Sequence, residues 1–248
     1  MDNKYRVPAV EKADAVLQAI ADRPHRLRLI DLSAELGIHK SSLFSLLATM
    51  EALRWVIKDD ADTYALGSAM ARFGGAYARH NDLVRAFHRE APAAAAAIGE
   101  TVQLARLEGT EVLYLAKEEV PSPIRLASDP GMKFPAHATA LGKALLSGRS
   151  ERELHALYPE PQLQPLTPYG ITAVEALLQE VEQARRGGCA FDLQEAVIGF
   201  CCVAAPIRDA RGDIAAAVSA SMPVHMWESK RDAAREHIVR LAARLSNL

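Results

Sequence analysis

The feature that most constrains this chain is the residue pattern between positions 29 and 66. Hydrophobic residues recur there three and four positions apart, as one buried helix face requires, and Gly37 interrupts them once. Glycine adopts the backbone angles of a sharp turn without steric cost. The pattern therefore predicts two helices joined by a tight turn. Residues 55–57 and 64–66 then bracket a polar run, as the two strands of a short hairpin would.

The second of these helices has an apolar face and a polar face. The apolar face carries Leu43, Leu46, Leu47, Met50 and Leu53. The polar face carries His39, Lys40, Ser41, Ser42, Ser45 and Thr49. A helix, a turn, a helix and a wing in this order can place such a polar face in the major groove of DNA. We therefore expect these polar residues to face DNA, with Arg26 and Arg28 contacting phosphates.

An ordinary pair of packed helices is the alternative, and the charge balance does not decide between the two. Residues 1–75 hold ten Lys or Arg and ten Asp or Glu, without the basic excess that favours nucleic acid. The distribution of charge is uneven, however. Basic residues cluster at positions 23–28, whereas acidic residues crowd positions 59–62. We expect phosphate contacts from the first cluster and little penetration of the groove by the wing.

Length and composition leave room for a second domain. The chain has 248 residues, half of them hydrophobic, and a net charge of −2. It contains no apolar run of the roughly 18 residues that span a membrane, and its start does not resemble a signal peptide. Its three cysteines form no CxxC pair. We therefore expect reduced thiols and a cytoplasmic location.

The pattern divides the chain into three parts. Residues 1–67 form the head, 68–82 a linker helix that can bend at Gly74 and Gly75, and 83–248 a second domain. In that domain we predict helices at 83–98, 150–157, 172–186 and from 227, and strands at 101–107, 112–116, 199–207 and 214–222. The predicted class is α+β, with a mixed sheet flanked by helices.

Three segments of the second domain could carry chemistry. Thr139 can cap a helix and leave the N–H groups of Ala140 and Leu141 at its positive end, which suits an anion. Ser219 and Ser221 lie two apart on a strand, so both hydroxyls face one side and can bond either a ligand or neighbouring backbone. The third segment carries Asp192, which precedes the strand of Cys202.

The whole chain resembles the IclR family of bacterial transcriptional regulators. Three segments carry the resemblance. AELGIHKSSLFSLLATM followed by YALG is similar to the family's winged helix-turn-helix, and AHATALGKALLSG and GCAFDLQEAVIGFCCVAAPIRDARGDIAAAVSASMP are similar to its two effector-domain signatures. The resemblance implies a GAF-like domain that binds a small organic acid, a homodimer or a dimer of dimers (homotetramer), and binding to double-stranded operator DNA.

The resemblance also implies which residues contact the effector. By motif position these are Phe134, Ala140, Leu141, Asp192, Cys202, Ser219 and Ser221. It implies no catalytic residue, no metal ligand and no cofactor. The head departs from the family pattern at Phe44 and Ser45, where a basic or polar pair is usual. An arginine at this position would add roughly 1–3 kcal/mol of base discrimination. We interpret Phe44 as a core residue rather than a thymine-methyl contact.

Two alternatives belong to other classes of function. A cysteine hydrolase could use Cys202 with His137 and Asp192, but a thiol within an apolar strand is usually inert, and no hydrolase motif is present. A metabolite-binding protein whose head contacts only other proteins is the second alternative, and the neutral charge of the head favours it slightly.

Overall fold

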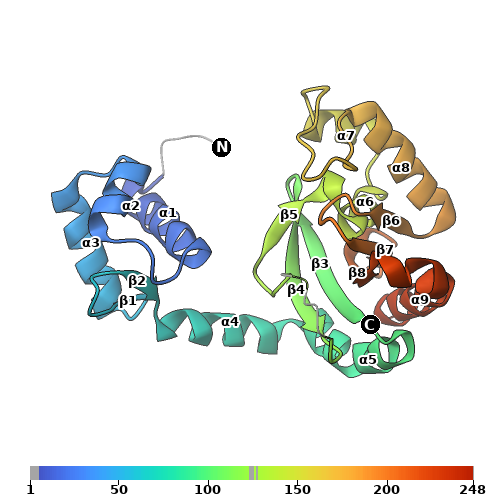
Figure 1. Cartoon of the computed structure of the whole chain (residues 1–248), viewed down its shortest axis with the longest axis horizontal. Coiled ribbons are helices and arrows are strands. Elements are labelled where there is room, and N and C mark those ends of the chain that lie inside the picture. The colour runs from blue at the N-terminus through green and yellow to red at the C-terminus, as the bar shows by residue number, and fades with distance from the viewer. Residues whose placement is uncertain (1–5, 123–125, 127, 248) are drawn as a thin grey trace. The chain divides into compact units, whose positions relative to one another are not determined.

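The structure is a computed structural model that describes residues 6–122, 126 and 128–247. Its contacts divide the chain into an N-terminal unit that ends at His80 and a C-terminal unit that begins at Asn81 (Figure 1). None of the described helices is both long enough and apolar enough to span a membrane.

The N-terminal unit packs helices against a two-stranded wing. Its elements are α1 (Pro8–Asp22), α2 (Leu29–Leu36), α3 (Lys40–Ala52), β1 (Val56–Lys58), β2 (Tyr64–Leu66) and α4 (Ser68–His80). Gly37 has a φ of 64° and ends α2, as predicted. Strands β1 and β2 pair antiparallel. An isolated bridge between Arg28 and Thr63 ties the segment before α2 to the wing.

The core of this unit follows the predicted leucine face only in part. Leu43, Leu47 and Met50 are buried with residues of α1 and α2, and Leu46 is half-buried. Leu53 is 51% exposed, so its assignment to the buried face was wrong, because it lies just past the last turn of α3. Phe44 is 64% exposed, and its assignment to the core was also wrong. Successive residues of a helix point about 100° apart, so Phe44 turns away from the core that Leu43 enters.

The C-terminal unit contains one large sheet and the helices around it. Its elements are α5 (Asp82–Ile98), β3 (Thr101–Glu108), β4 (Glu111–Glu118), β5 (Lys133–Pro135), the 3₁₀ turn η2 (Ala136–Ala138), α6 (Ala140–Leu146), α7 (Glu151–Leu157), α8 (Val174–Gly187), β6 (Ala190–Leu193), β7 (Phe200–Arg208), β8 (Ile214–Pro223) and α9 (Val224–Leu245). The predicted α+β class is confirmed. Strands β5 and β6 were not predicted.

The strands follow the order β5-β4-β3-β8-β7-β6. All five pairings of neighbouring strands in the described part of the sheet are antiparallel, so the sheet differs from the mixed sheet that we expected. Strand β3, early in the unit, lies beside β8, near its end. The centre of the sheet is therefore built from segments that are distant in sequence.

Helices cover both faces of this sheet (Figure 1). α5 and α9 pack on each other and on strands of one face, whereas α6 packs against β6, β7 and β8 on the other, with α8 outside it. Consecutive residues of β8 are buried, because its side chains point alternately to the two covered faces of the sheet. Between α6 and the sheet the packing leaves a cavity.

Candidate functional site

The cavity lies in the C-terminal unit, where the start of α6 faces strands β6, β7 and β8. The space between its lining atoms, counting the part open to solvent, is about 400 Å³. Its walls are formed by Tyr114, Leu126, Ser128, Phe134, Thr139, Ala140, Leu141, Asp192, Ala196, Val197, Phe200, Cys202, Ser219 and Ser221. Most of these side chains are apolar, with a few polar groups at defined positions.

All seven residues predicted to contact an effector line this one cavity. They come from five elements of the fold: Phe134 from β5, Ala140 and Leu141 from α6, Asp192 from β6, Cys202 from β7, and Ser219 and Ser221 from β8. The structure therefore brings the predicted set together. Their role as ligand contacts stays a prediction.

The start of α6 is fixed by two local features. Thr139 caps the helix, because its Oγ1 accepts a hydrogen bond from the Gly142 N–H at 2.9 Å. Gly142 lies directly against η2: a Cβ atom at this position would be 2.0 Å from the carbonyl oxygen of Ala136. Only glycine permits this approach, which holds the first turn of α6 at the cavity wall.

Three polar residues form a row across neighbouring strands. Asp192 lies opposite Cys202 in the pairing of β6 with β7, and Cys202 lies opposite Ser221 in the pairing of β7 with β8. Cys202 Sγ is 3.1 Å from Ser221 Oγ. Asp192 Oδ1 accepts a hydrogen bond from the Glu195 N–H at 2.7 Å. The row presents a carboxyl, a thiol and a hydroxyl on one wall of the cavity.

Burial changes the protonation of this row. Asp192 is 2% exposed, and loss of water raises its pKa from 3.8 to about 7. Burial and the nearby Asp192 raise the pKa of the Cys202 thiol well above its ordinary value. The thiol is therefore protonated at neutral pH and is a poor nucleophile.

The two serine hydroxyls bond a side chain rather than neighbouring backbone. Ser219 Oγ and Ser221 Oγ both donate to Gln103 Oε1, at 3.0 and 2.8 Å. Gln103 lies on β3, is fully buried, and donates from Nε2 to Ser128 Oγ at 2.6 Å. Sequence reasoning missed Gln103 and Ser128. A glutamine between Val102 and Leu104, in an otherwise apolar strand, was the signal that could have identified the first of them.

A buried ion pair lies behind the cavity. Lys143 of α6 is fully buried. Its Nζ lies 2.7 Å from Glu195 Oε1 and 2.7 Å from Glu180 Oε2. Glu195 follows Asp192 closely in the chain and binds it through its backbone N–H. Burial raises the pKa of Glu195, and Lys143 opposes this rise. The lysine therefore compensates the carboxylates at the back of the cavity wall.

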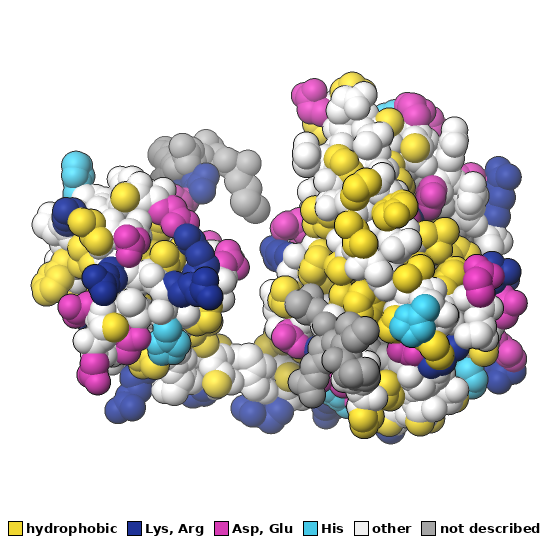
Figure 2. Space-filling model, in the orientation of Figure 1, with side chains coloured by type: hydrophobic (Ala, Val, Ile, Leu, Met, Phe, Trp, Pro, Cys, Tyr) yellow, Lys and Arg dark blue, Asp and Glu magenta, His cyan; other side chains and the backbone are white. Residues whose placement is uncertain are grey.

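Exposed apolar residues follow two lining residues in the chain. Leu193, after Asp192, is 50% exposed, and Ile198, after Val197, is 61% exposed. Figure 2 shows hydrophobic side chains gathered over the viewed face of the C-terminal unit, whereas charged side chains are scattered over the N-terminal unit.

The second candidate site is the outer face of α3. His39, Lys40, Ser41, Ser42, Ser45 and Thr49 are all exposed, as the predicted polar face requires. Two of the hydroxyls are engaged by their own helix: Ser45 Oγ donates to the Ser41 carbonyl at 3.2 Å, and Thr49 Oγ1 donates to the Ser45 carbonyl at 2.9 Å. Their oxygens can still accept hydrogen bonds from base edges. The exposed Phe44 ring adds an apolar group that suits a thymine methyl.

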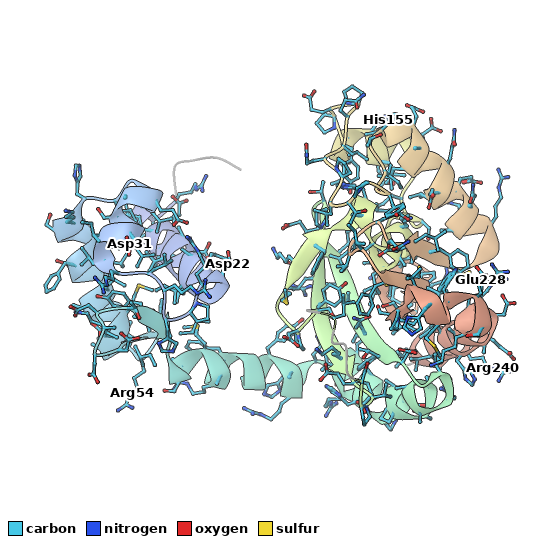
Figure 3. All side chains as sticks on the ribbon, viewed as in Figure 1. Asp22, Asp31, Arg54, His155, Glu228 and Arg240 are labelled. Atoms are coloured by element: carbon cyan, nitrogen blue, oxygen red, sulfur yellow. The ribbon has the colours of Figure 1, made fainter. Side chains whose placement is uncertain are left out.

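The basic cluster before α2 is divided by its contacts. Arg23 binds Glu35, and His25 Nδ1 lies 3.0 Å from Asp59 Oδ2 at the wing. Arg26 and Arg28 are exposed and form no ion pair with the described residues. The Arg28 backbone N–H donates to Asp31 at the start of α2, labelled in Figure 3. Of the cluster, Arg26 and Arg28 are thus the side chains most available to phosphates.

The hydrolase alternative is not supported by this geometry. His137 Nε2 lies 3.0 Å from the Gln164 carbonyl oxygen, and its ring contacts Tyr158. His137 does not belong to the described lining of the cavity, in which Cys202 is protonated. A histidine that activates Cys202 would have to contact its sulfur.

Two family models match the chain. Residues 9–60 match the IclR helix-turn-helix domain, and residues 75–247 match the C-terminal domain of the bacterial transcriptional regulator IclR. The chain is also 30% identical over 237 residues to the HTH-type transcriptional repressor AllR of Escherichia coli K12, which covers 95% of this chain and 88% of that protein.

Solved structures are similar over nearly the whole chain. An IclR transcriptional regulator from Alicyclobacillus acidocaldarius is 25% identical, with a TM-score of 0.88 and coverage of 98% of this chain and 99% of that one. An IclR homolog from Microbacterium hydrocarbonoxydans, complexed with 4-hydroxybenzoate, is 19% identical, with a TM-score of 0.81 and coverage of 96% and 98%. The second likeness concerns the fold alone.

Proposed function

Because the chain belongs to the IclR family of bacterial transcriptional regulators, we propose that its cavity binds a small organic acid and that this binding changes operator affinity. The observation that carries the proposal is the convergence of Asp192, Cys202, Ser219 and Ser221, with the start of α6, on one largely apolar cavity. The related protein with 4-hydroxybenzoate bound supports a carboxylate of similar size.

Each polar group of the cavity contributes a different contact to such a ligand. The hydroxyls of Ser219 and Ser221 face a carboxylate, while the apolar wall of Phe134 and Leu141 contacts its carbon skeleton. The N–H groups at the start of α6 add a partial positive charge. Asp192, with a pKa near 7, hydrogen-bonds a ligand hydroxyl or shares a proton with the ligand.

The effector proposal predicts a loss of affinity in two single variants. Ser219→Ala or Ser221→Ala leaves a buried charged acceptor without one partner, which costs about 1–3 kcal/mol, or roughly 5- to 150-fold in affinity. Calorimetry with small carboxylates, including 4-hydroxybenzoate, measures this loss. Ser229→Ala is the matched control, because this exposed hydroxyl on α9 bonds only the Met226 carbonyl in the described contacts and lies outside the cavity lining. Unchanged affinity in both cavity variants would move the effector site elsewhere.

The two sites are coupled through the chain that joins them. Helix α4 continues from Ser68 to His80 through Gly74 and Gly75, and each glycine weakens a helix by roughly 1 kcal/mol. We propose that effector binding shifts the operator affinity of the head through this bendable segment. Linkage then requires that operator DNA change effector affinity by the same factor as effector changes DNA affinity. Calorimetry with and without operator measures both factors.

The DNA proposal assigns different roles to Arg28 and Ser42. Arg28→Ala is expected to weaken binding to all sequences alike and to reduce the slope of affinity against salt by about one, because phosphate contacts carry no base information. Ser42→Ala is expected to lower the preference for operator over random DNA. Fluorescence anisotropy across a range of salt concentrations measures both effects. If neither variant changes binding, α3 does not enter the groove as proposed.

We propose that the regulator assembles through its head as a homodimer or a dimer of dimers. Within the N-terminal unit, Ala13 and Ile20 of α1 serve the head core, whereas Val10 is 65% exposed, and Phe73 on α4 is 48% exposed. These exposed apolar residues can form a two-fold contact, and two-fold symmetry matches a palindromic operator.

This assembly predicts a light-scattering mass of two or four times 26.9 kDa at micromolar concentration. Val10→Asp combined with Phe73→Asp is expected to reduce that mass by half or more, since a charge in an apolar contact is unpaired. A single-chain mass with full operator binding would contradict the proposal. The DNA that such a regulator binds lies in the cytoplasm, and the three free cysteines suit that location.

The alternative in which the head contacts only proteins makes the opposite prediction. Selection of genomic DNA fragments with the purified protein enriches a discrete palindromic site only if α3 reads bases. The exposed polar face of α3 and the exposed Arg26 and Arg28 favour DNA. Failure of the selection with folded protein would favour protein contacts.

A further inference from the structure

Gln103 lies beside the serine pair on the same face of the sheet, outside the described lining of the cavity. It lies opposite Ser219 in the pairing of β3 with β8, and none of its surface is exposed. Its flanking residues Val102 and Leu104 are buried and apolar. A buried amide in such surroundings is costly unless its polar atoms are bonded, and here both ends of the amide have serine partners.

The hydrogen-bond arrangement in the structure gives the serine pair a definite polarity. Gln103 Oε1 accepts from Ser219 and Ser221, so both hydroxyl protons are committed to the glutamine. The two serine oxygens then offer only lone pairs, and one lone pair of Ser221 Oγ can accept from the protonated Cys202 thiol, whose Sγ is 3.1 Å away. A pair of acceptors suits a ligand that donates hydrogen bonds, such as an amide N–H, and repels a carboxylate, which only accepts.

Turning the Gln103 amide by 180° reverses this polarity with almost no change of shape. Nε2 then faces the serines, and its two N–H groups match the two serine oxygens one to one. Both serine protons are released toward the cavity. At the other end Oε1 accepts from the hydroxyl of Ser128, which in the present orientation accepts from Nε2 at 2.6 Å. Each group keeps a partner, so both orientations are compatible with burial.

We propose that Gln103 is a positioning residue whose amide orientation sets the hydrogen-bond polarity of Ser219 and Ser221 and thereby the choice between an anionic and a neutral ligand. The inference rests on the proposed function, because it specifies how the same cavity accepts a carboxylate. With a carboxylate bound, Nε2 faces the serines and both hydroxyls donate to the ligand. With a donor ligand bound, Oε1 faces them and both oxygens accept.

The test replaces the amide by a group that only accepts. In Gln103→Glu, a carboxylate of almost the same shape holds both serine protons and adds a negative charge, because the two donating hydroxyls favour its ionised form. Binding is measured by calorimetry at pH 8, and for the wild-type protein also at pH 6, where Asp192 is mostly protonated. The ligands are matched pairs: acetate and acetamide, pyruvate and pyruvamide, benzoate and benzamide, and 4-hydroxybenzoate and 4-hydroxybenzamide. The expected result is that the ratio of acid affinity to amide affinity falls by more than about 100-fold, because two donors to a charged acceptor are lost.

Gln103→Met is the matched control for packing. It keeps the length of the side chain without hydrogen bonds or charge, so the ratio is expected to fall far less than in Gln103→Glu. If both variants weaken acids and amides equally, Gln103 acts only through packing and the inference is overturned. If the wild-type protein binds none of the acids, both the proposed function and the inference are overturned. Wild-type binding of an acid with an unchanged ratio in Gln103→Glu overturns the inference alone.

A second measurement uses the wild-type protein, so it does not depend on whether a variant with a buried charge folds. In wild-type protein with ¹⁵N-labelled glutamine, the side-chain resonances of Gln103 are assigned by their absence in Gln103→Met. Saturation with an acid is expected to shift both N–H protons of Gln103 downfield, because both then bond serine oxygens, whereas the matched amide leaves one of them upfield. Identical Gln103 resonances in the two saturated states overturn the inference.

Discussion

Replacing Lys143 by methionine is expected to lower the free energy of unfolding of the C-terminal unit by about 3–5 kcal/mol. The lysine is fully buried between Glu195 and Glu180, and removal of one partner leaves a buried carboxylate without compensation. Glu195 bears most of the cost, because its side chain is only 8% exposed and its Oε2 has no partner among the described residues. The unfolding midpoint is expected to fall by roughly 6–20 °C.

Fluorescence of Trp227 follows this unit alone when the other tryptophan, Trp55, is replaced by phenylalanine. The control is Arg240→Ala on the outer face of α9, labelled in Figure 3, where the ion pair with Glu236 is exposed and contributes about 1 kcal/mol or less. Adding Glu195→Gln to Lys143→Met is expected to restore part of the loss, since the uncompensated charge is removed. Equal midpoints for Lys143→Met and the control would refute the structural role of the buried pair.

Asp192 is expected to make the unfolding free energy depend on pH. Its pKa is about 7 in the folded protein against an ordinary value of 3.8, so between these pH values the folded state holds a proton that the unfolded state releases. Stability from this group is therefore greatest below about pH 4 and is lost as the pH rises to 7. At 1.36 kcal/mol per pKa unit, the loss amounts to as much as about 4 kcal/mol.

The measurement compares wild-type protein with Asp192→Asn by denaturant unfolding between about pH 4 and 8. The wild-type unfolding free energy minus that of the variant is expected to decrease by up to the same 4 kcal/mol over this interval. Asp232→Asn serves as the control, because this carboxylate is 90% exposed whereas Asp192 is buried. The same pH profile for Asp192→Asn as for the control would place the pKa of Asp192 near its ordinary value.

Elements with a strong period were predicted well from the sequence. Two helices joined by a turn at Gly37 were predicted and are observed as α2 and α3, and the long strands β7 and β8 were predicted within two residues of their observed bounds. Strands β5 and β6 were missed because three or four residues carry too little alternation to separate a strand from a loop. Their place at the two edges of the sheet depends on pairing with β4 and β7, which local sequence does not specify.

Features of the cavity were predicted correctly where they depend on a single helix or strand. Alternation placed Ser219 and Ser221 on one side of a strand, and Thr139 was identified as a helix cap; both are observed. Gln103 and Glu195 were missed because their roles depend on partners elsewhere in the chain, 116 residues away for Gln103 and Ser219 and 52 for Glu195 and Lys143. The prediction that Phe44 is buried was wrong for another reason. It rested on residue type alone and did not consider which side of the helix position 44 faces.

The pairing of β3 with β8 has a consequence for newly synthesised protein. Gln103 leaves the ribosome 116 residues before Ser219, which at about 5–20 residues per second is roughly 6–23 seconds. The head is complete by His80 and contains its own core, so it folds first. During that interval a nascent chain carries a folded head, while the cavity wall that β8 must supply has not yet been synthesised. Such a chain has its helix-turn-helix in place before the wall of its cavity exists.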